Sequence, residues 1–193
     1  MKKRFLLARI LGLLLLILGL GILLAQQYLI FESIRKNTEI SGQIQALLPD
    51  RRSGIPSDYS LAEMPILQID STDYVCLLEV PSLELSVPVE NQWQAGLLST
   101  RPGRFWGSVY NGTLILGGGN HKGSFDFCAQ LDLGDQILVT DMQGTQFRCS
   151  VARIIRSNSA DFEDLSDETY PLTLFVREQY EARYIIVRCD WDY

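Results

Sequence analysis

The sequence predicts an all-β domain, a closed or nearly closed barrel of about eight short strands, carried on an N-terminal helix. Three observations predict it. Short runs of β-branched, aromatic and leucine residues recur between turn signals from residue 73 to residue 188. No stretch after residue 48 has helical periodicity long enough for a core helix. The chain also begins with a basic tip and a long apolar run. A series of short strands without covering helices favours a sheet that closes on itself.

The N-terminal segment, residues 1–25, is predicted to be a cytoplasmic tip and a transmembrane signal anchor. Met1–Arg4 carries three cations, and Phe5–Ala25 is apolar apart from Arg9. A run of that length can cross a bilayer as one helix. The preceding cations would keep the N-terminus in the cytoplasm and place the rest of the chain outside. A cleaved signal peptide is the alternative, but no A-x-A pattern precedes Gln26.

Residues 26–63 are predicted to form a stalk and linker. Apolar residues at roughly helical spacing extend the helix to about Leu48. These residues are Ile30, Ile34, Ile40, Ile44 and Leu47. Residues 49–65 contain breakers and polar residues without periodicity, which is typical of a linker. The folded domain is therefore expected to cover residues 64–193.

Strand signals dominate the folded domain. The expected strands, in chain order, are Asp73–Val80, Leu85–Val89, Thr113–Leu116, Gln136–Thr140, Thr145–Ile155, the run LTLFV (172–176) and the run RYIIVR (183–188). Turn signals at Asn111-Gly112 and Gln143-Gly144 separate neighbouring strands. Residues 91–110 are expected to be irregular, Ser124–Leu131 to form one helical turn, and Ser157–Thr169 to form an acidic loop.

The net charge argues against a nucleic-acid partner, and the positions of the cysteines indicate their redox state. Residues 37–193 carry 11 Lys/Arg against 22 Asp/Glu, a net charge of −11. Nucleic-acid binding depends on cations that neutralise phosphates, so this acidity excludes a nucleic-acid partner. Cys76, Cys128, Cys149 and Cys189 each lie in an apolar segment, and no CxxC spacing occurs, which predicts buried free thiols. Disulfides stay possible in an exported domain, and three pairings remain open.

The stretch GGGNHKGS (117–124) has one feature of a phosphate-binding loop. Gly118 and Gly123 have the spacing of the two glycines in such a loop. However, Lys122 precedes the second glycine, and no long helix follows to offer its N-terminus. Nucleotide binding is therefore not expected.

The order of motifs in the folded domain resembles that of a sortase. The matching stretches are DYVCLLEVPSLELSVPV, LILGGGN, LGDQILVTDMQGTQF, LTLF and RYIIVRC. Each motif is weak alone, but their order and spacing together are specific, and they cover Met64–Asp190. The short clostridial branch of the class B/D-like sortases is the most similar. The resemblance implies an eight-stranded β-barrel, a membrane anchor and the chemistry of a cysteine transpeptidase.

The sequence departs from the family at the residues that carry this chemistry. Sortases use a thiolate nucleophile, a histidine that protonates the leaving amine and an arginine that stabilises the oxyanion. The family's Gly-His-Asn corresponds to residues 118–120, so Gly119 stands at the histidine position. The family's Thr-Leu-x-Thr-Cys corresponds to residues 173–177, so Arg177 stands at the cysteine position. The family arginine corresponds to Arg183.

Other residues near these positions leave alternatives open. His121 lies two residues beyond the histidine position and is either a shifted base or a solvated loop side chain. Arg177 either turns outward and pairs with Glu178, Glu181 or an aspartate of the 161–168 loop, or faces a groove. In the second case Arg177, Arg183 and Asn120 would receive an anion such as a peptide carboxylate. The 161–168 loop is expected to be solvated and not a calcium-responsive loop, so neither a metal nor a cofactor is expected.

These observations favour a catalytically inactive sortase-like protein. It would be a single-pass protein of a Gram-positive cell membrane with its folded domain outside. There it would act as a binding or accessory module for a sorting-signal or pilin-type peptide, or dock with an active sortase. The alternatives are a working cysteine transpeptidase with a relocated nucleophile, and a structural envelope protein that has lost the groove.

Overall fold

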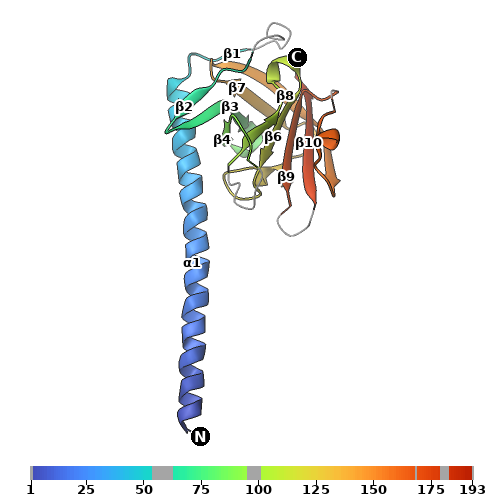
Figure 1. The fold of residues 1–193 in the computed structure, drawn as a ribbon. Coiled ribbons are helices and arrows are strands. Elements are labelled where there is room, and N and C mark those ends of the chain that lie inside the picture. Colours follow the sequence, from blue (N-terminus) through green and yellow to red (C-terminus); the bar gives the residue numbers. More distant parts are fainter. Residues whose placement is uncertain (1, 54–62, 95–100, 168, 179–182, 193) are drawn as a thin grey trace.

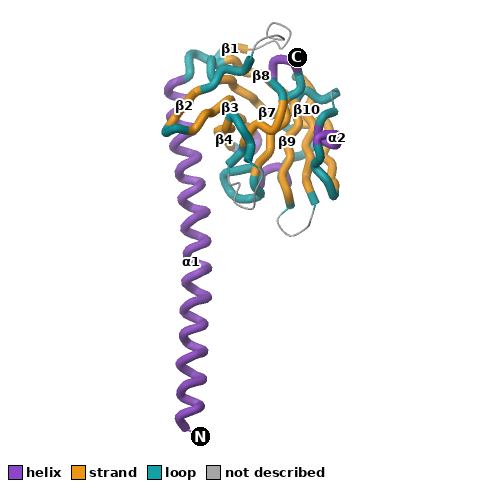
Figure 2. The backbone as a smooth tube through the Cα atoms, in the orientation of Figure 1, coloured by secondary structure: helices purple, strands orange, loops and turns teal. Residues whose placement is uncertain are grey.

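The computed structural model describes residues 2–53, 63–94, 101–167, 169–178 and 183–192. Within them the chain forms one long helix followed by a β-barrel (Figures 1 and 2). The helices are α1 (Lys2–Leu47) and α2 (Phe162–Leu165). The strands are β1 (Arg52–Ser53), β2 (Leu67–Ile69), β3 (Thr72–Val80), β4 (Leu85–Glu90), β5 (Gly103–Trp106), β6 (Leu114–Gly118), β7 (Gln136–Asp141), β8 (Thr145–Ser157), β9 (Leu172–Arg177) and β10 (Tyr184–Trp191). In the described part of the chain, 3₁₀ turns lie at Pro81–Leu83, Val109–Asn111 and Asp126–Ala129.

Eight of these strands close into a barrel, which confirms the predicted strand number and architecture. The order of paired neighbours is β8-β10-β9-β6-β5-β4-β3, and β7 pairs with both β3 and β8. Two pairs, β4 with β5 and β6 with β9, are parallel, and the other pairs of the ring are antiparallel. β1 and β2 are attached outside the ring, at β8 and β3. A closed ring leaves no open sheet edge among its own strands.

Strand alternation sorts the side chains into two layers. On β9, Leu172, Leu174 and Val176 belong to the core inside the barrel. Phe175, on the opposite face of the same strand, belongs to a separate apolar cluster. Successive side chains of a strand point to opposite faces, so β9 contributes to both layers. The outer layer covers β6, β9 and β10 and is the surface that carries the candidate site.

Two hydrogen bonds and two buried isoleucines fix helix α1 to the barrel. Ile40 and Ile44 are buried in a cluster with side chains of the barrel, Tyr74, Leu77 and Met142. The amide of Asn37 donates to the carbonyl of Gly123 at 2.5 Å, and the hydroxyl of Ser41 donates to the carbonyl of Ser86 at 3.2 Å. The N-terminal part of α1 projects away from the barrel as a straight rod (Figure 1).

The projecting part of α1 exposes large apolar side chains. Leu and Ile side chains between residues 13 and 24 are each more than half exposed. Helix α1 has 46 residues, so the two helical segments expected from the sequence form one continuous helix. Among the residues that the structure describes, no helix combines the length and the hydropathy that a membrane span requires.

The segment 91–110, which we expected to be irregular, contains strand β5. This strand forms because its backbone pairs with the end of β4 and with the segment that follows β4. Glu90 pairs with Gly103, the amide of Glu90 donates to the carbonyl of Pro102 at 2.9 Å, and the amide of Trp93 donates to the carbonyl of Arg104 at 2.9 Å. Gly103 permits this approach, because a Cβ there would lie 2.6 Å from the Cα of Trp93. The single helical turn expected at residues 124–131 is present as the 3₁₀ turn Asp126–Ala129.

Candidate functional site

Strand pairing brings together the three positions that the resemblance in sequence assigned to catalytic residues. Gly118 pairs with Val176 across β6 and β9, and Arg177 pairs with Tyr184 across β9 and β10. Gly119 and Arg183 immediately follow and precede these paired positions. All three positions, 119, 177 and 183, therefore lie at the same end of three adjacent strands.

Two of these positions hold exposed arginines. Arg177 and Arg183 are both exposed, so neither cation carries the cost of burial. Arg177 forms no ion pair with any residue in the described part of the chain, while its neighbour Glu178 pairs with Arg156 at 3.3 Å. The 161–168 loop instead pairs through Asp167 with Arg188. The alternative in which Arg177 pairs with Glu178 or with an aspartate of that loop is thus not observed among the described residues, and Glu181 lies outside them.

The loop after Gly119 closes back on itself. The amide of Gly119 donates to the hydroxyl of Ser124 at 3.0 Å, and the carbonyl of Gly119 accepts from the amide of Phe125 at 3.0 Å. Asn120 lies half-buried at the start of this loop. At the far side of the loop, Gly123 adopts φ +83° and meets helix α1, where a Cβ would lie 3.3 Å from Ile34. The loop is therefore held between the end of β6 and α1.

The imidazole of His121 contacts the backbone of this loop. Its Nδ1 lies 3.2 Å from the carbonyl of Lys122, and its Nε2 is buried without a partner among the described residues. Burial raises the pKa of nearby Asp126 above its ordinary value, and the charge of His121 partly offsets that rise. None of the contacts of His121 in the described part of the chain is to Arg177.

The four cysteines lie in the interior of the barrel as free thiols, as the sequence predicted. Cys76, Cys149 and Cys189 are fully buried, and Cys128 is 1% exposed. Burial raises the pKa of Cys76 to about 12. It also raises the pKa values of Cys128, Cys149 and Cys189 well above the ordinary value of a thiol. Thiols in this environment are inert, because the thiolate is the reactive form.

Three aromatic rings cover the middle of the outer layer. Trp93, Phe105 and Phe175 contact one another edge to face, with ring centroids 5.1 to 5.8 Å apart. They pack over Gly117 of β6, where a Cβ would lie 2.6 Å from Phe175 and 3.0 Å from Trp93. Gly117 therefore lets the rings sit directly on the sheet, next to the strand ends that carry Arg177.

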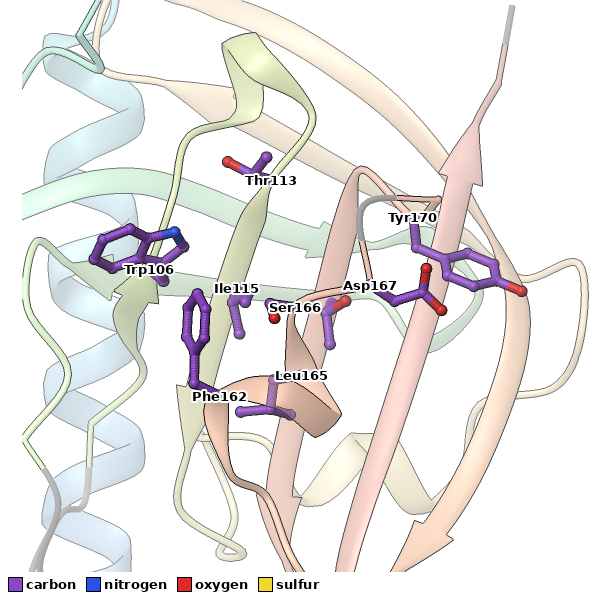
Figure 3. A pocket seen from close by; sticks show the side chains of 9 residues that line it. Trp106, Thr113, Ile115, Phe162, Leu165, Ser166, Asp167 and Tyr170 are labelled. Atoms are coloured by element: carbon purple, nitrogen blue, oxygen red, sulfur yellow. The ribbon is translucent and has the colours of Figure 1, made fainter.

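A cavity of about 110 Å³ opens on the same outer layer (Figure 3). Its floor is formed by Ile115 of β6 and Thr173 of β9, and its wall by the segment between β8 and β9. The lining residues are Trp106, Thr113, Ile115, Phe162, Leu165, Ser166, Asp167, Tyr170 and Thr173. Trp106 and Phe162 meet edge to face at 5.4 Å, and both are exposed.

Arg188 of β10 anchors the wall of this cavity. It is 8% exposed, and its guanidinium pairs with the carboxylate of Asp167. It also donates to the carbonyl of Asp164 at 2.8 Å and lies over the ring of Tyr170 at 5.3 Å. The acidic loop, expected to be solvated, is thus fixed to the barrel at one carboxylate. Hydrogen bonds from Thr169, together with Arg188, hold the pKa of Asp167 below its ordinary value.

Sequence reasoning missed the cavity and the cation that anchors its wall. Trp93 packs on the outer layer, whereas Trp106 lines the cavity. The sequence predicts Arg188 only as the last residue of a strand. The residues on either side of it, Val187 and Cys189, are apolar and face the core. Because successive side chains of a strand point to opposite faces, this pattern is the signal that assigns Arg188 to the outer face.

No protein-family model and no curated protein matches the chain. Solved structures do. Sortase C1 from Streptococcus agalactiae is similar with a TM-score of 0.54 and 19% identity, over 72% of this chain and 75% of that one. A Clostridium perfringens sortase D5 transpeptidase is similar with a TM-score of 0.53 and 15% identity, over 71% and 87%. Sortase E1 from Streptomyces coelicolor, with a tripeptide in its active site, is similar with a TM-score of 0.51 and 18% identity, over 66% and 92%. Together with the closed ring of eight strands, these likenesses show that the chain has the sortase fold.

Proposed function

We propose that this chain is a sortase-fold protein without transpeptidase activity that acts as a peptide-binding or accessory module at the cell surface. One observation carries the proposal. At the shared end of β6, β9 and β10, the positions aligned with the family's catalytic residues hold Gly119, Arg177 and Arg183. The arginine of the family is retained as Arg183. The nucleophilic cysteine and the proton-donating histidine are replaced by Arg177 and Gly119.

The chemistry of acyl transfer supports this reading. Transpeptidation by a cysteine requires a thiolate that attacks the scissile carbonyl and forms a thioester. A guanidinium at position 177 has no nucleophilic lone pair at any accessible pH. Glycine at position 119 can neither donate nor accept a proton through a side chain. The remaining Arg183 can stabilise negative charge, but it cannot form the covalent intermediate.

Burial of the cysteines argues against a relocated nucleophile. With its pKa near 12, the Cys76 thiol has only about one part in 10⁵ as thiolate at neutral pH. The other three thiols are as deeply buried inside the barrel. A peptide would have to enter the hydrophobic core to reach any of them.

Peptides are the ligand class that the proposal assigns to the outer face. The sortase E1 structure holds a tripeptide in its active site, and the present chain shares that fold. The exposed guanidinium of Arg177, with Arg183 beside the same strand end, offers charge-assisted hydrogen bonds to a carboxylate or to backbone carbonyls. A sorting-signal or pilin-type peptide, or the surface of an active sortase, would supply such groups.

We also propose that the N-terminal helix anchors the chain in a membrane. The sequence places three cations before the apolar run Phe5–Ala25, which favours a cytoplasmic N-terminus and an outward-facing barrel. Apolar side chains exposed around residues 13–24 of α1 need an apolar environment. Membrane fractionation, followed by protease digestion of intact cells, tests this placement, and recovery of the chain in the soluble fraction would contradict it.

Peptide cleavage tests the proposed lack of activity. The full chain in lipid nanodiscs is incubated with a panel of sorting-signal peptides and an amine acceptor, and the products are separated by chromatography. We expect no cleavage while an authentic sortase in parallel reactions cleaves its own signal. Turnover of any peptide that disappears in an Arg183→Ala variant would show that the chain is an active enzyme.

A further inference from the structure

We propose that the cleft between helix α1 and the barrel binds the headgroup of a zwitterionic phospholipid with a primary ammonium, phosphatidylethanolamine, from the membrane that holds α1. The inference rests on the proposed membrane anchor and names a ligand that the anchor brings within reach of the barrel. The cleft lies where β4 begins, and no residue of β6 or β9 in the described part of the chain lines it.

The cleft is large enough for a lipid headgroup. It has a volume of about 340 Å³, and pockets that hold small molecules measure about 300–1,000 Å³. Residues of α1 form one side, and the start of β4 and the segment after β6 form the other. The cleft therefore has room for a phosphate, its amino alcohol and the glycerol that carries them.

The cleft begins where the exposed apolar part of α1 ends. Tyr28 and Phe31 are 65% and 67% exposed on the projecting rod (Figure 1), and tyrosine is enriched where membrane-spanning helices cross the interface. Ile34, which lines the cleft, follows Phe31 by three residues, or about 4.5 Å along the helix axis. The headgroup layer on each side of a bilayer is about 5–8 Å thick. In an anchored chain the cleft therefore lies at the height of the headgroups.

The cleft carries one charge of each sign. Lys122 and Asp126 both line it, and neither forms an ion pair within the described residues. Burial raises the pKa of Asp126, and the nearby charges of His121 and Lys122 partly offset that rise. A zwitterionic headgroup supplies a phosphate for Lys122 and an ammonium for Asp126, and both contacts are charge-assisted hydrogen bonds.

The other polar groups of the cleft favour a primary ammonium. The hydroxyl of Ser86 is buried without a partner among the described residues, and the amide of Gln130 lies at the same cleft. A primary ammonium has three hydrogens to donate, so it can reach Asp126, Ser86 and Gln130 together. Quaternary ammonium groups are bound by cages of several aromatic rings, and Phe127 is the one ring among the described lining residues.

The cleft also has an apolar part, and it is held in place before any ligand arrives. Leu83 and Leu85 pack against the barrel core but stay partly exposed, so they offer a surface to the glycerol and the first acyl carbons. The hydrogen bond from Asn37 to the carbonyl of Gly123 fixes α1 against the loop. A preformed site lowers the entropic cost of binding. Anionic headgroups lack the cation and meet the net charge of −11 over residues 37–193, which disfavours them.

Photocrosslinking from the membrane tests this site. The full chain is placed in phosphatidylcholine nanodiscs that hold a small fraction of a phosphatidylethanolamine probe, with a diazirine on the first carbons of one acyl chain. A phosphatidylcholine probe with the same diazirine is the matched control, and mass spectrometry of peptides maps the labelled segments. We expect both probes to label α1 within residues 13–24. The phosphatidylethanolamine probe should label residues 83–86 and 122–130 at least fivefold more than the control probe does.

Matched variants locate the site. Lys122→Ala and Asp126→Asn should each lower the labelling of the barrel segments at least fivefold and leave the labelling of α1 unchanged. Lys36→Ala removes an exposed cation of α1 outside the cleft, and Asp132→Asn neutralises an exposed carboxylate outside it. These two controls should change the labelling less than twofold. Circular dichroism confirms that each variant keeps its β-structure.

The outcomes separate the lipid site from the membrane anchor. Labelled α1 with unlabelled barrel segments, equal labelling of those segments by the two probes, or unchanged labelling in Lys122→Ala and Asp126→Asn overturns the lipid site and leaves the anchor standing. Unlabelled α1 overturns the anchor, and the membrane as the source of the ligand falls with it. Loss of the barrel labelling to an equal concentration of soluble glycerophosphoethanolamine would also overturn the membrane as the source, because the cleft would then take the free headgroup.

Discussion

Replacing Gly117 by alanine should destabilise the barrel, because its Cβ would collide with the aromatic cluster. In the structure that atom would lie 2.6 and 2.9 Å from two carbons of the Phe175 ring and 3.0 Å from Trp93. Ordinary carbon contacts begin near 3.4 Å, so the ring would have to move by about 0.8 Å. Overpacking of this kind costs about 1–3 kcal/mol. The reduced entropy of the unfolded chain returns about 0.5–1 kcal/mol.

The expected net loss for Gly117→Ala is about 1–2 kcal/mol in the free energy of unfolding. For a chain of this length, that loss lowers Tm by about 2–8 °C. Denaturant unfolding of the full chain in mild detergent, followed by circular dichroism, measures it. Gly42→Ala is the matched control, because no atom lies within 4 Å of the new Cβ on helix α1. That control should leave stability unchanged or raise it, since alanine favours helix by up to about 1 kcal/mol.

A second substitution tests the proposed cause. If the clash with Phe175 is responsible, Phe175→Leu should relieve it, and the double variant should be more stable than the sum of the two single losses predicts. A favourable coupling of about 1 kcal/mol is in the range measured for residues in contact. Strictly additive losses, or a Gly117→Ala variant as stable as the parent chain, would refute the packing described here.

Three further perturbations follow from single contacts. Ser71 has φ +65° in the turn between β2 and β3, so Ser71→Gly should raise the free energy of unfolding by about 1 kcal/mol in denaturant titrations, and a loss would contradict the turn. The hydroxyl of Tyr110 donates to buried Asp141 at 2.6 Å, so Tyr110→Phe should cost about 1.5–3 kcal/mol, and a neutral result would count against that bond. The lowered pKa of Asp167 means that its pairing with Arg188 is intact above about pH 4, the ordinary pKa of aspartate, and is lost as pH falls below it. Methyl NMR of the neighbouring loop should therefore change between pH 5 and pH 2, and an unchanged spectrum would exclude this role.

Local pattern was sufficient to predict the barrel but not the cavity on its surface. The run of leucine, β-branched and aromatic residues from Leu172 to Val176 predicts a strand, and the structure confirms it as β9, with Leu172, Leu174 and Val176 in the core. Strand β5 lacks such a pattern. It follows Pro102 and forms because the backbone of the segment after β4 offers it partners, a tertiary effect that residue patterns do not contain.

The candidate site, too, was predictable from the sequence only in part. The motif spacing was sufficient to predict that positions 119, 177 and 183 meet, since each lies next to a strand end and the family order fixes the neighbours. The cavity joins Trp106, Phe162 and Thr173, which are separated by long stretches of chain. The loop between them is anchored by Arg188, whose partner Asp167 lies 21 residues away in sequence. No local periodicity connects such residues, so their meeting is seen only in the folded chain.

The central claim, that no covalent chemistry occurs on this barrel, is tested most directly by intact-protein mass spectrometry. The full chain is incubated with sorting-signal peptides without an amine acceptor, so that any acyl-enzyme intermediate accumulates, and its mass is then measured. We predict an unchanged mass, because Arg177 stands at the strand end and all four thiols are buried. A mass increase equal to an acyl peptide fragment, mapped to any cysteine, would contradict the account and identify a relocated nucleophile.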